Sequence, residues 1–166
     1  MAKKTLAKPF NIDNILFNCR DILRNARNSG SFFEKRDMML TLVFLRFIGE
    51  KFEDGIENLR QSLKAQGLNP DDKDIQAAFF DDPTFTDGTY NLPIEARWST
   101  ITKTPATKLN VALDTALEKI AKSSKQLKGC FVEGTFTTRN LAANDIKKLV
   151  DEVTKITHKA FGTEKD

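Results

Sequence analysis

The residue types that most often perform catalysis or bind metals are scarce in this sequence. It contains one histidine, His158, and two cysteines, Cys19 and Cys130, with no C-x-x-C pair. Catalytic triads and zinc sites need more of these side chains, at closer spacing. We interpret Cys19, at an apolar helical position, as a buried reduced thiol and His158 as a solvated side chain. No catalytic, cofactor-binding or metal-binding residue is therefore assigned in this chain.

Nucleotide-binding patterns are missing as well. None of the eight glycines lies in a G-x-G-x-x-G or G-x-x-x-x-G-K loop, whose backbone amides hold phosphates. Asp82-Pro83-Thr84-Phe85 is similar to the D/N-P-P-F/Y/W motif with which amino-methylating DNA methyltransferases hold a flipped base. Thr84 replaces the second proline and no buried strand precedes the motif, so we interpret it as a loop. An enzyme that uses Asp82 to Phe85 is kept as a third possibility.

Lysines form a different kind of candidate site. Lys119, Lys122, Lys125 and Lys128 recur every three residues, and no acidic residue follows Glu118 within this stretch. Ammonium groups spaced in this way can contact the phosphates of duplex DNA or an acidic partner. The alternative is a solvated helix end, where the helix dipole favours lysine.

A second, weaker basic candidate lies near the N-terminus. It consists of Arg20, Arg24, Arg27 and Arg36. Asp13 and Asp21 dilute its positive field. No aromatic platform is interleaved with either basic group, so stacking on single-stranded nucleic acid is not expected.

The composition is that of an ordinary globular chain. Its 166 residues are 40% hydrophobic and 30% charged, enough to bury one core. The 26 basic and 23 acidic residues give a net charge of +3, which permits a nucleic-acid partner without requiring one. We expect residues 11–162 to form a single helical domain, residues 1–10 to be flexible and residues 163–166 to fray.

The most apolar stretch, MMLTLVFLRFIGEKFE at 38–53, is too short to span a membrane. Arg46 interrupts it, whereas a spanning helix needs about 20 predominantly apolar residues. Residues 1–11 contain lysines but no apolar segment typical of a secretory signal. We therefore expect a soluble, cytoplasmic protein with no membrane partner.

The first two elements are predicted to be helices. Apolar residues recur at helical spacing from Ile12 to Ala26, Asn11 can cap the start, and Asn28-Ser29-Gly30 can end the helix. Ser31-Phe32-Phe33-Glu34 has the form of a capping box, so a second helix should begin there.

The second helix is expected to be long and central. Its apolar residues alternate in steps of four and three as far as Leu63, and further apolar residues between 40 and 48 widen the stripe. We predict that it is buried on most sides near its start, lies at the centre of a bundle, and ends at Gly67. Gly49 and Asp54-Gly55 are the points where it could bend.

The rest of the chain predicts shorter helices around an irregular segment. Asn69-Pro70 should open a third helix and Thr104-Pro105 a fourth, and the last helix should end near Phe161-Gly162. Between them, 81–104 should form an irregular loop or small hairpin around Asp87-Gly88, with one helical turn at Pro93–Trp98 that buries the only tryptophan. SSKQLKGCFVEGTF, at 123–136, is expected to be irregular. The predicted fold class is all-α, and the predicted core includes Met38, Leu42, Leu45, Phe52 and Trp98.

Four stretches carry a likeness to a known family. They are NILFNCRDILRNA, MLTLVFLRFIGEKFE, LPIEARWSTI, and LKGCF followed by the final helix. In this order they resemble the N-terminal helical domain of the modification (M) subunit of type I restriction-modification DNA methyltransferases. The second stretch is similar to that family's L-x-F-L-K-Y-I-S-x-x-F-E segment and the third to its P-x-E-A-R-W loop. The resemblance covers nearly the whole chain.

The resemblance implies a role in a larger assembly. In that family the helical domain precedes a catalytic domain that binds S-adenosylmethionine and methylates adenine at N6. The implied partners are this catalytic domain, a DNA-specificity subunit, a second M subunit, and duplex DNA in the complex. Neither the family's glycine-rich cofactor loop nor its N-P-P-F/Y tetrad occurs in this sequence, so the cofactor is expected in the parent subunit and not in this chain.

Two functions of different classes follow. The first is an assembly and DNA-clamping domain of an adenine-N6 methyltransferase, with the lysines at 119–128 as candidate phosphate contacts. The alternative is a stand-alone helical adaptor that binds a protein and has no DNA role, which is favoured by the absence of a base-reading helix-turn-helix. A downstream reading frame with the cofactor loop and the tetrad would favour the first.

Overall fold

The computed structural model describes residues 11–80 and 92–157. The expectations for residues 1–10 and 163–166, for His158, for Asp82–Phe85 and for the Asp87-Gly88 turn lie outside these ranges. Within them the chain is helical and contains no strand, which confirms the all-α class. Its α-helices are α1 (Ile12–Asn25), α2 (Phe32–Ala65), α3 (Lys73–Phe80), α4 (Trp98–Lys103), α5 (Leu109–Ser123), α6 (Thr135–Arg139) and α7 (Ala143–Thr154), with 3₁₀ turns η1 (Ile94–Ala96) and η2 (Ala106–Lys108).

The ends of α2 follow from its local sequence. The Ser31 hydroxyl accepts a hydrogen bond from the backbone N–H of Glu34, and the Glu34 carboxylate accepts one from the backbone N–H of Ser31, which confirms the capping box. At the other end Gly67 has φ +74°, and the amide of Leu68 donates to the carbonyl of Leu63 at 2.9 Å. This is a Schellman ending, which the glycine permits because it tolerates positive φ.

The helix between these ends continues through both predicted weak points. It has 34 residues, which corresponds to about 51 Å at 1.5 Å per residue. At Gly49, a Cβ would lie 3.0 Å from the Cβ of Trp98. The small residue therefore allows α4 to approach α2 closely.

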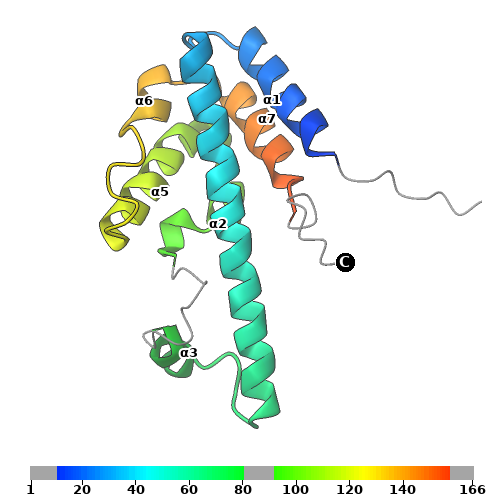
Figure 1. The fold of residues 1–166 in the computed structure, drawn as a ribbon, viewed down its shortest axis with the longest axis vertical. Helices are drawn as coiled ribbons and strands as arrows, with labels where there is room; N and C mark the ends of the chain where they lie inside the picture. Colours follow the sequence, from blue (N-terminus) through cyan, green and yellow to red (C-terminus); the bar gives the residue numbers. More distant parts are fainter. Residues whose placement is uncertain (1–10, 81–91, 158–166) are drawn as a thin grey trace, which may run out of the picture.

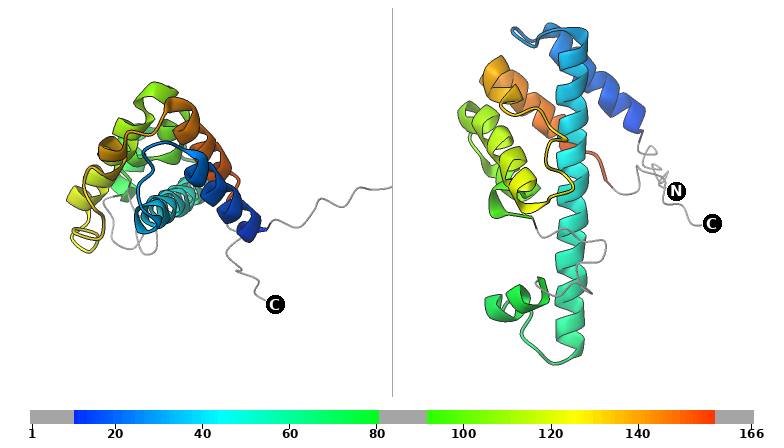
Figure 2. Two further views of the ribbon diagram at one scale, coloured as in Figure 1. Left: turned by 90° about the horizontal axis from the view of Figure 1, so that it is seen from above. Right: turned by 60° about the vertical axis from the view of Figure 1, so that its left-hand side comes forward.

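The burial of α2 changes along its length. In Figure 1, α2 runs the length of the molecule, and its C-terminal half extends past the other helices toward α3. It packs against α1, α4 and α7, and Figure 2 shows these elements gathered on one side of it. Leu40 consequently remains 53% exposed. Between residues 38 and 50 it is the one exposed residue, and the others are buried or half-buried, whereas from 51 to 65 burial follows a single face. This confirms the prediction that the helix is buried on most sides in its first half and on one side later.

The core is formed where α1, α2, α4, α5 and α7 converge. All five predicted core residues are buried: Met38, Leu42 and Leu45 at 0%, Trp98 at 2% and Phe52 at 3% exposed. They belong to one continuous apolar cluster with side chains from α1, α5 and α7. A core of this kind supplies most of the favourable free energy of folding.

Several predicted boundaries need correction. Asp72, not Asn69, caps α3: its Oδ1 accepts hydrogen bonds from the amides of Asp74 and Ile75, at 2.9 and 3.2 Å. The described part of the expected irregular segment, 92–104, is η1 followed by α4, and buries Trp98 as predicted. The last helix ends at Thr154 instead of near Phe161.

One short helix was not predicted from sequence. α6 begins within the stretch expected to be irregular, directly after Gly134, whose φ is +70°. Its first amides are held by Asp114 of α5, which accepts hydrogen bonds from the amides of Phe136 and Thr137, at 3.1 and 2.7 Å. Asp114 lies 22 residues before Phe136 and 23 before Thr137 in the sequence. No local sequence motif therefore predicts this helix.

Among the residues that the structure describes, none of the helices combines the length and apolarity that a bilayer crossing requires.

Candidate functional site

The lysines singled out from the sequence lie at the end of α5 and in the turn that follows it. Lys119 and Lys122 are on the last turns of the helix, whereas Lys125 and Lys128 are in the turns between α5 and α6. All four side chains are exposed. Leu117 and Ile120, on the same part of α5, are buried and hold the end of this helix against the core.

Three of the four lysines share one cleft. Lys122, Lys125 and Lys128 line a depression of about 900 Å³ between the outer face of α5 and the loop at 128–134. Lys119 does not line it. The turns that carry the lysines are held by backbone hydrogen bonds, from Leu127 to Ser124 at 3.2 Å and from Cys130 to Leu127 at 3.1 Å.

The fold also brings carboxylates to these lysines. Glu95 of η1 lies 3.8 Å from the Lys119 ammonium, and Glu118 lies 2.5 Å from that of Lys122. Glu133 lines the same cleft. Glu95 and Glu133 come from other segments of the chain. The positive charge around the lysines is therefore smaller than the stretch after Glu118, which has no acidic residue, suggests.

The pair of Lys122 and Glu118 is electrostatically coupled but accessible to water. The hydrogen bond from Lys122 lowers the pKa of Glu118, and the same hydrogen bond raises the pKa of Lys122. Both groups are more than half exposed, so water screens their attraction and the pair contributes little to stability. The ammonium group of Lys122 therefore stays accessible to solvent beside its carboxylate partner.

The arginine group differs from its prediction in one respect. The Arg20 guanidinium lies 5.9 Å from the centre of the Phe17 ring, and that of Arg36 lies 5.2 Å from Phe33. Both phenylalanines are more than 60% exposed. The expectation that no aromatic side chain accompanies these arginines is wrong, because a spacing of three residues places each pair on one helix face. That spacing was visible in the sequence.

Two of these arginines also form ion pairs with neighbouring carboxylates on the surface. Arg24 pairs with Asp21 at 2.6 Å, and Arg36 pairs with Asp37 at 3.1 Å. These acids compensate part of the positive charge. The lysine cleft therefore remains the stronger candidate for binding an anion.

The two cysteines have different environments. Cys19 is fully buried, and this burial raises the pKa of its thiol to about 12. Cys130 is exposed. Among the described residues there is no group of histidine, cysteine and carboxylate side chains that could hold a metal ion.

A model of a known protein family matches most of the chain. The model described as the HsdM N-terminal domain matches residues 12–153. Among curated proteins, none matches the sequence. The matched range covers α1 to α7 nearly completely.

Proposed function

The chain belongs to the HsdM N-terminal domain family, the N-terminal domain of the type I restriction-modification M subunit, and on this basis we propose that it is an assembly and DNA-clamping domain. The observation that carries the proposal is the family match over residues 12–153. The family implies that the parent M subunit is a methyltransferase and that it works in a complex with other subunits. The lysine cleft adds a surface suited to phosphate.

The proposal also names the partners of this domain. The domain packs on the catalytic domain of the parent subunit and helps the DNA-specificity subunit and a second M subunit to close around duplex DNA. This reading is favoured over the stand-alone adaptor because the family match extends across nearly all described helices. The adaptor remains the alternative that the experiment below separates.

The cofactor of the parent enzyme, S-adenosylmethionine, does not fit this chain. The sequence has no glycine-rich cofactor loop, and the described residues form no strand from which such a loop could lead into a helix. We propose that another part of the parent subunit binds the cofactor.

DNA contact in this proposal is electrostatic. Lys122, Lys125 and Lys128 present three ammonium groups to one side of a cleft, which can neutralise phosphates without reading bases. Each phosphate neutralised on duplex DNA adds about 0.9 to the slope of log affinity against log salt. The domain would thus hold DNA while another subunit supplies sequence recognition.

The test replaces all four candidate lysines, Lys119, Lys122, Lys125 and Lys128, by glutamine in the M subunit and measures duplex binding by the assembled complex. The matched control carries the same charge change at the exposed lysines Lys64, Lys73, Lys108 and Lys148. We expect the first variant to bind more weakly and to lose about 0.9 of slope per lost contact, while the control keeps the wild-type slope. Equal slopes for both variants and the wild type would contradict the DNA-clamping role and favour the adaptor.

A further inference from the structure

The lysine cleft has two walls, and the fold builds them in different ways. One wall is the outer face of α5, where Lys122 lies on a continuous helix. The other wall is the loop at 128–134, which carries Lys128. In Figure 1 this loop leaves the end of α5 and runs back beside it to α6. Lys128 therefore shares a cleft with Lys122 only while the loop stays against α5.

The middle of the loop is attached to α2. The ring of Phe131 packs against that of Phe44, with centroids 4.9 Å apart. Phe131 also packs against the apolar core. These contacts join the loop to α2, and a separate contact joins its far end to α5.

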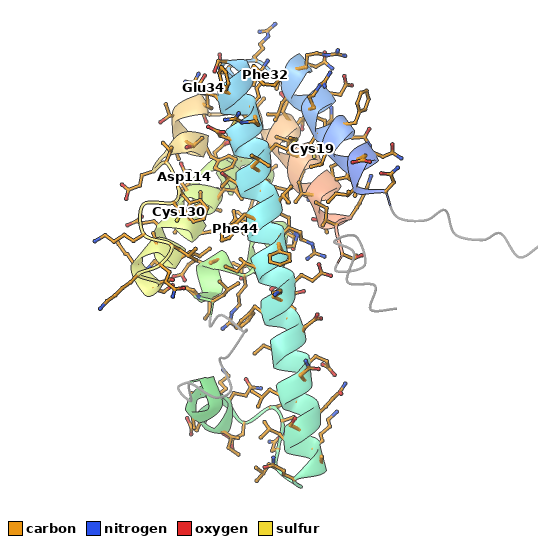
Figure 3. The ribbon with its side chains drawn as sticks, in the orientation of Figure 1. Cys19, Phe32, Glu34, Phe44, Asp114 and Cys130 are labelled. Carbon is orange, nitrogen blue, oxygen red and sulfur yellow. The ribbon has the colours of Figure 1, made fainter. Side chains whose placement is uncertain are left out.

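That second contact is the carboxylate of Asp114. Its Oδ1 accepts a hydrogen bond from the amide of Phe136 at 3.1 Å, and its Oδ2 accepts two from Thr137, from the amide at 2.7 Å and from the hydroxyl at 2.6 Å. The side chain of Phe136 is fully buried. In Figure 3, Asp114 lies where α5 passes beside α6, and Cys130 lies lower on the loop. Both carboxylate oxygens thus hold the returning end of the loop to α5.

Asp114 is an unexpected residue for a cleft that binds phosphate. It lines the cleft together with the lysines. Lys122 lies eight positions after it on α5, which corresponds to about 12 Å along the helix axis. A carboxylate at this range lowers the positive potential of the cleft, so by its charge alone it opposes phosphate binding.

We propose that Asp114 is a positioning residue of the lysine cleft. By capping α6 it holds the loop at 128–134 against α5, and so keeps Lys128 in the cleft that Lys122 lines. The inference rests on the proposed function and deepens it, because it names a residue that shapes the DNA surface without contacting DNA. Removal of this carboxylate should weaken DNA contact, whereas its charge alone predicts stronger contact.

The test measures how far saturating duplex DNA slows the acetylation of each lysine in the assembled complex. Wild type is compared with Asp114→Asn and Asp114→Ala. Asparagine keeps one acceptor oxygen and has an amide donor in place of the other, and alanine keeps neither. We expect DNA to slow the acetylation of Lys128 several-fold in the wild type, less in Asp114→Asn and not at all in Asp114→Ala. Lys122, on α5 itself, should stay protected in all three.

Glu118→Gln is the matched control. It removes the same charge from the same cleft, but Glu118 accepts its hydrogen bond from Lys122 and not from α6. This variant should keep the protection of Lys128 and bind duplex DNA at least as tightly as the wild type. Asp114→Ala should bind more weakly and lose about 0.9 of the salt slope, which corresponds to one phosphate contact. Alanine also favours the helix more than aspartate does, so a weakened α5 would not explain that loss.

Hydrogen exchange in the M subunit alone gives a second measurement, which needs neither assembly nor DNA. In Asp114→Ala the amides of Phe136 and Thr137 should exchange at least about tenfold faster than in the wild type, because local opening of α6 becomes easier. The amides in the middle of α2 should exchange at unchanged rates. Equal exchange of the α6 amides in both proteins would contradict the inference.

The outcomes separate this inference from the proposed function. If DNA protects the cleft lysines in the wild type and Lys128 stays equally protected in Asp114→Ala, the inference is wrong and the DNA-clamping role stands. If Lys122 and Lys128 lose protection together in that variant, Asp114 supports α5 as a whole and the inference is also wrong. If DNA protects none of the cleft lysines in the wild type, the proposed function fails and the inference fails with it.

Discussion

The indole nitrogen of Trp98 donates a hydrogen bond to the hydroxyl of Thr154 at 3.0 Å. This contact joins α4 to α7. The Arg46 guanidinium lies 5.9 Å from the Trp98 ring and donates from Nε to the carbonyl of Ile156 at 3.0 Å. The P-I-E-A-R-W segment that signalled the family is therefore a point where α2, α4 and the end of α7 are tied together.

Replacing Thr154 by valine should destabilise the chain. The substitution keeps the shape of the side chain but leaves the indole N–H of Trp98, itself 2% exposed, without its acceptor, which costs about 1–3 kcal/mol. Urea unfolding followed by the fluorescence of the single tryptophan measures the loss. Thr107→Val, at an exposed position, is the control and should change little. Equal stability of the two variants would mean that the hydrogen bond contributes nothing.

Leu45→Asp should unfold the helical core. Leu45 is fully buried on α2, and an unpaired carboxylate there would cost several kcal/mol. Thermal unfolding monitored by circular dichroism provides the measurement, with Lys64→Ala on the exposed side of the same helix as the control. A folded Leu45→Asp chain of wild-type stability would show that this face is a partner surface instead of a core.

Gly49→Val should separate α2 from α4. A Cβ at this position would lie 3.0 Å from the Trp98 Cβ, and the added methyl groups would crowd it further, costing about 1–3 kcal/mol. Ala65→Val adds the same side chain at an exposed position of α2 and should cost about 0.5 kcal/mol through helix propensity alone. Their unfolding midpoints are compared in urea, and similar midpoints would contradict the close packing.

The hydrogen bond from Asn18 of α1 to Glu152 of α7 should weaken in acid. Burial raises the pKa of Glu152, but the hydrogen bonds from Asn18 and Lys155 and the charge of Lys155 outweigh it, so the pKa lies below its ordinary value of 4.5. A carboxyl group with a lowered pKa stabilises the folded state above the unfolded pKa, and this contribution disappears as the pH falls through the folded pKa.

The corresponding experiment compares wild type with Glu152→Gln. The difference between their unfolding free energies should be constant near neutral pH and should shrink below pH 4.5, where the wild-type carboxyl becomes protonated. Urea unfolding at several pH values measures it. A difference that does not depend on pH would show that Glu152 stabilises the fold through packing and not through its charge.

Local signals were enough to predict how α2 begins and ends. Ser31 and Glu34 satisfy each other's backbone amides, and Gly67 adopts the positive φ that ends the helix. Both effects involve residues within a few positions of one another, so the local sequence is sufficient to predict them. The apolar period likewise identified the buried residues Met38 and Leu42.

Features that depend on tertiary contacts could not be predicted in this way. α6 is capped by Asp114 from another helix, and the open face of α2 depends on which helices pack around it. For the candidate site, the spacing of the lysines predicted a shared surface, but Glu95 and Glu133 reach it from other segments. The exposure of Leu40 could not be predicted for the same reason, because its apolar side chain at a helical position is typical of a core residue.

Lysine footprinting of the assembled complex tests whether this domain holds DNA through the end of α5. Amine acetylation rates are measured by mass spectrometry with and without bound duplex DNA. We expect Lys122, Lys125 and Lys128 to react several-fold more slowly when DNA is bound, while Lys64 and Lys73 react at unchanged rates. Equal acetylation of the three cleft lysines in the free and DNA-bound complex would contradict it.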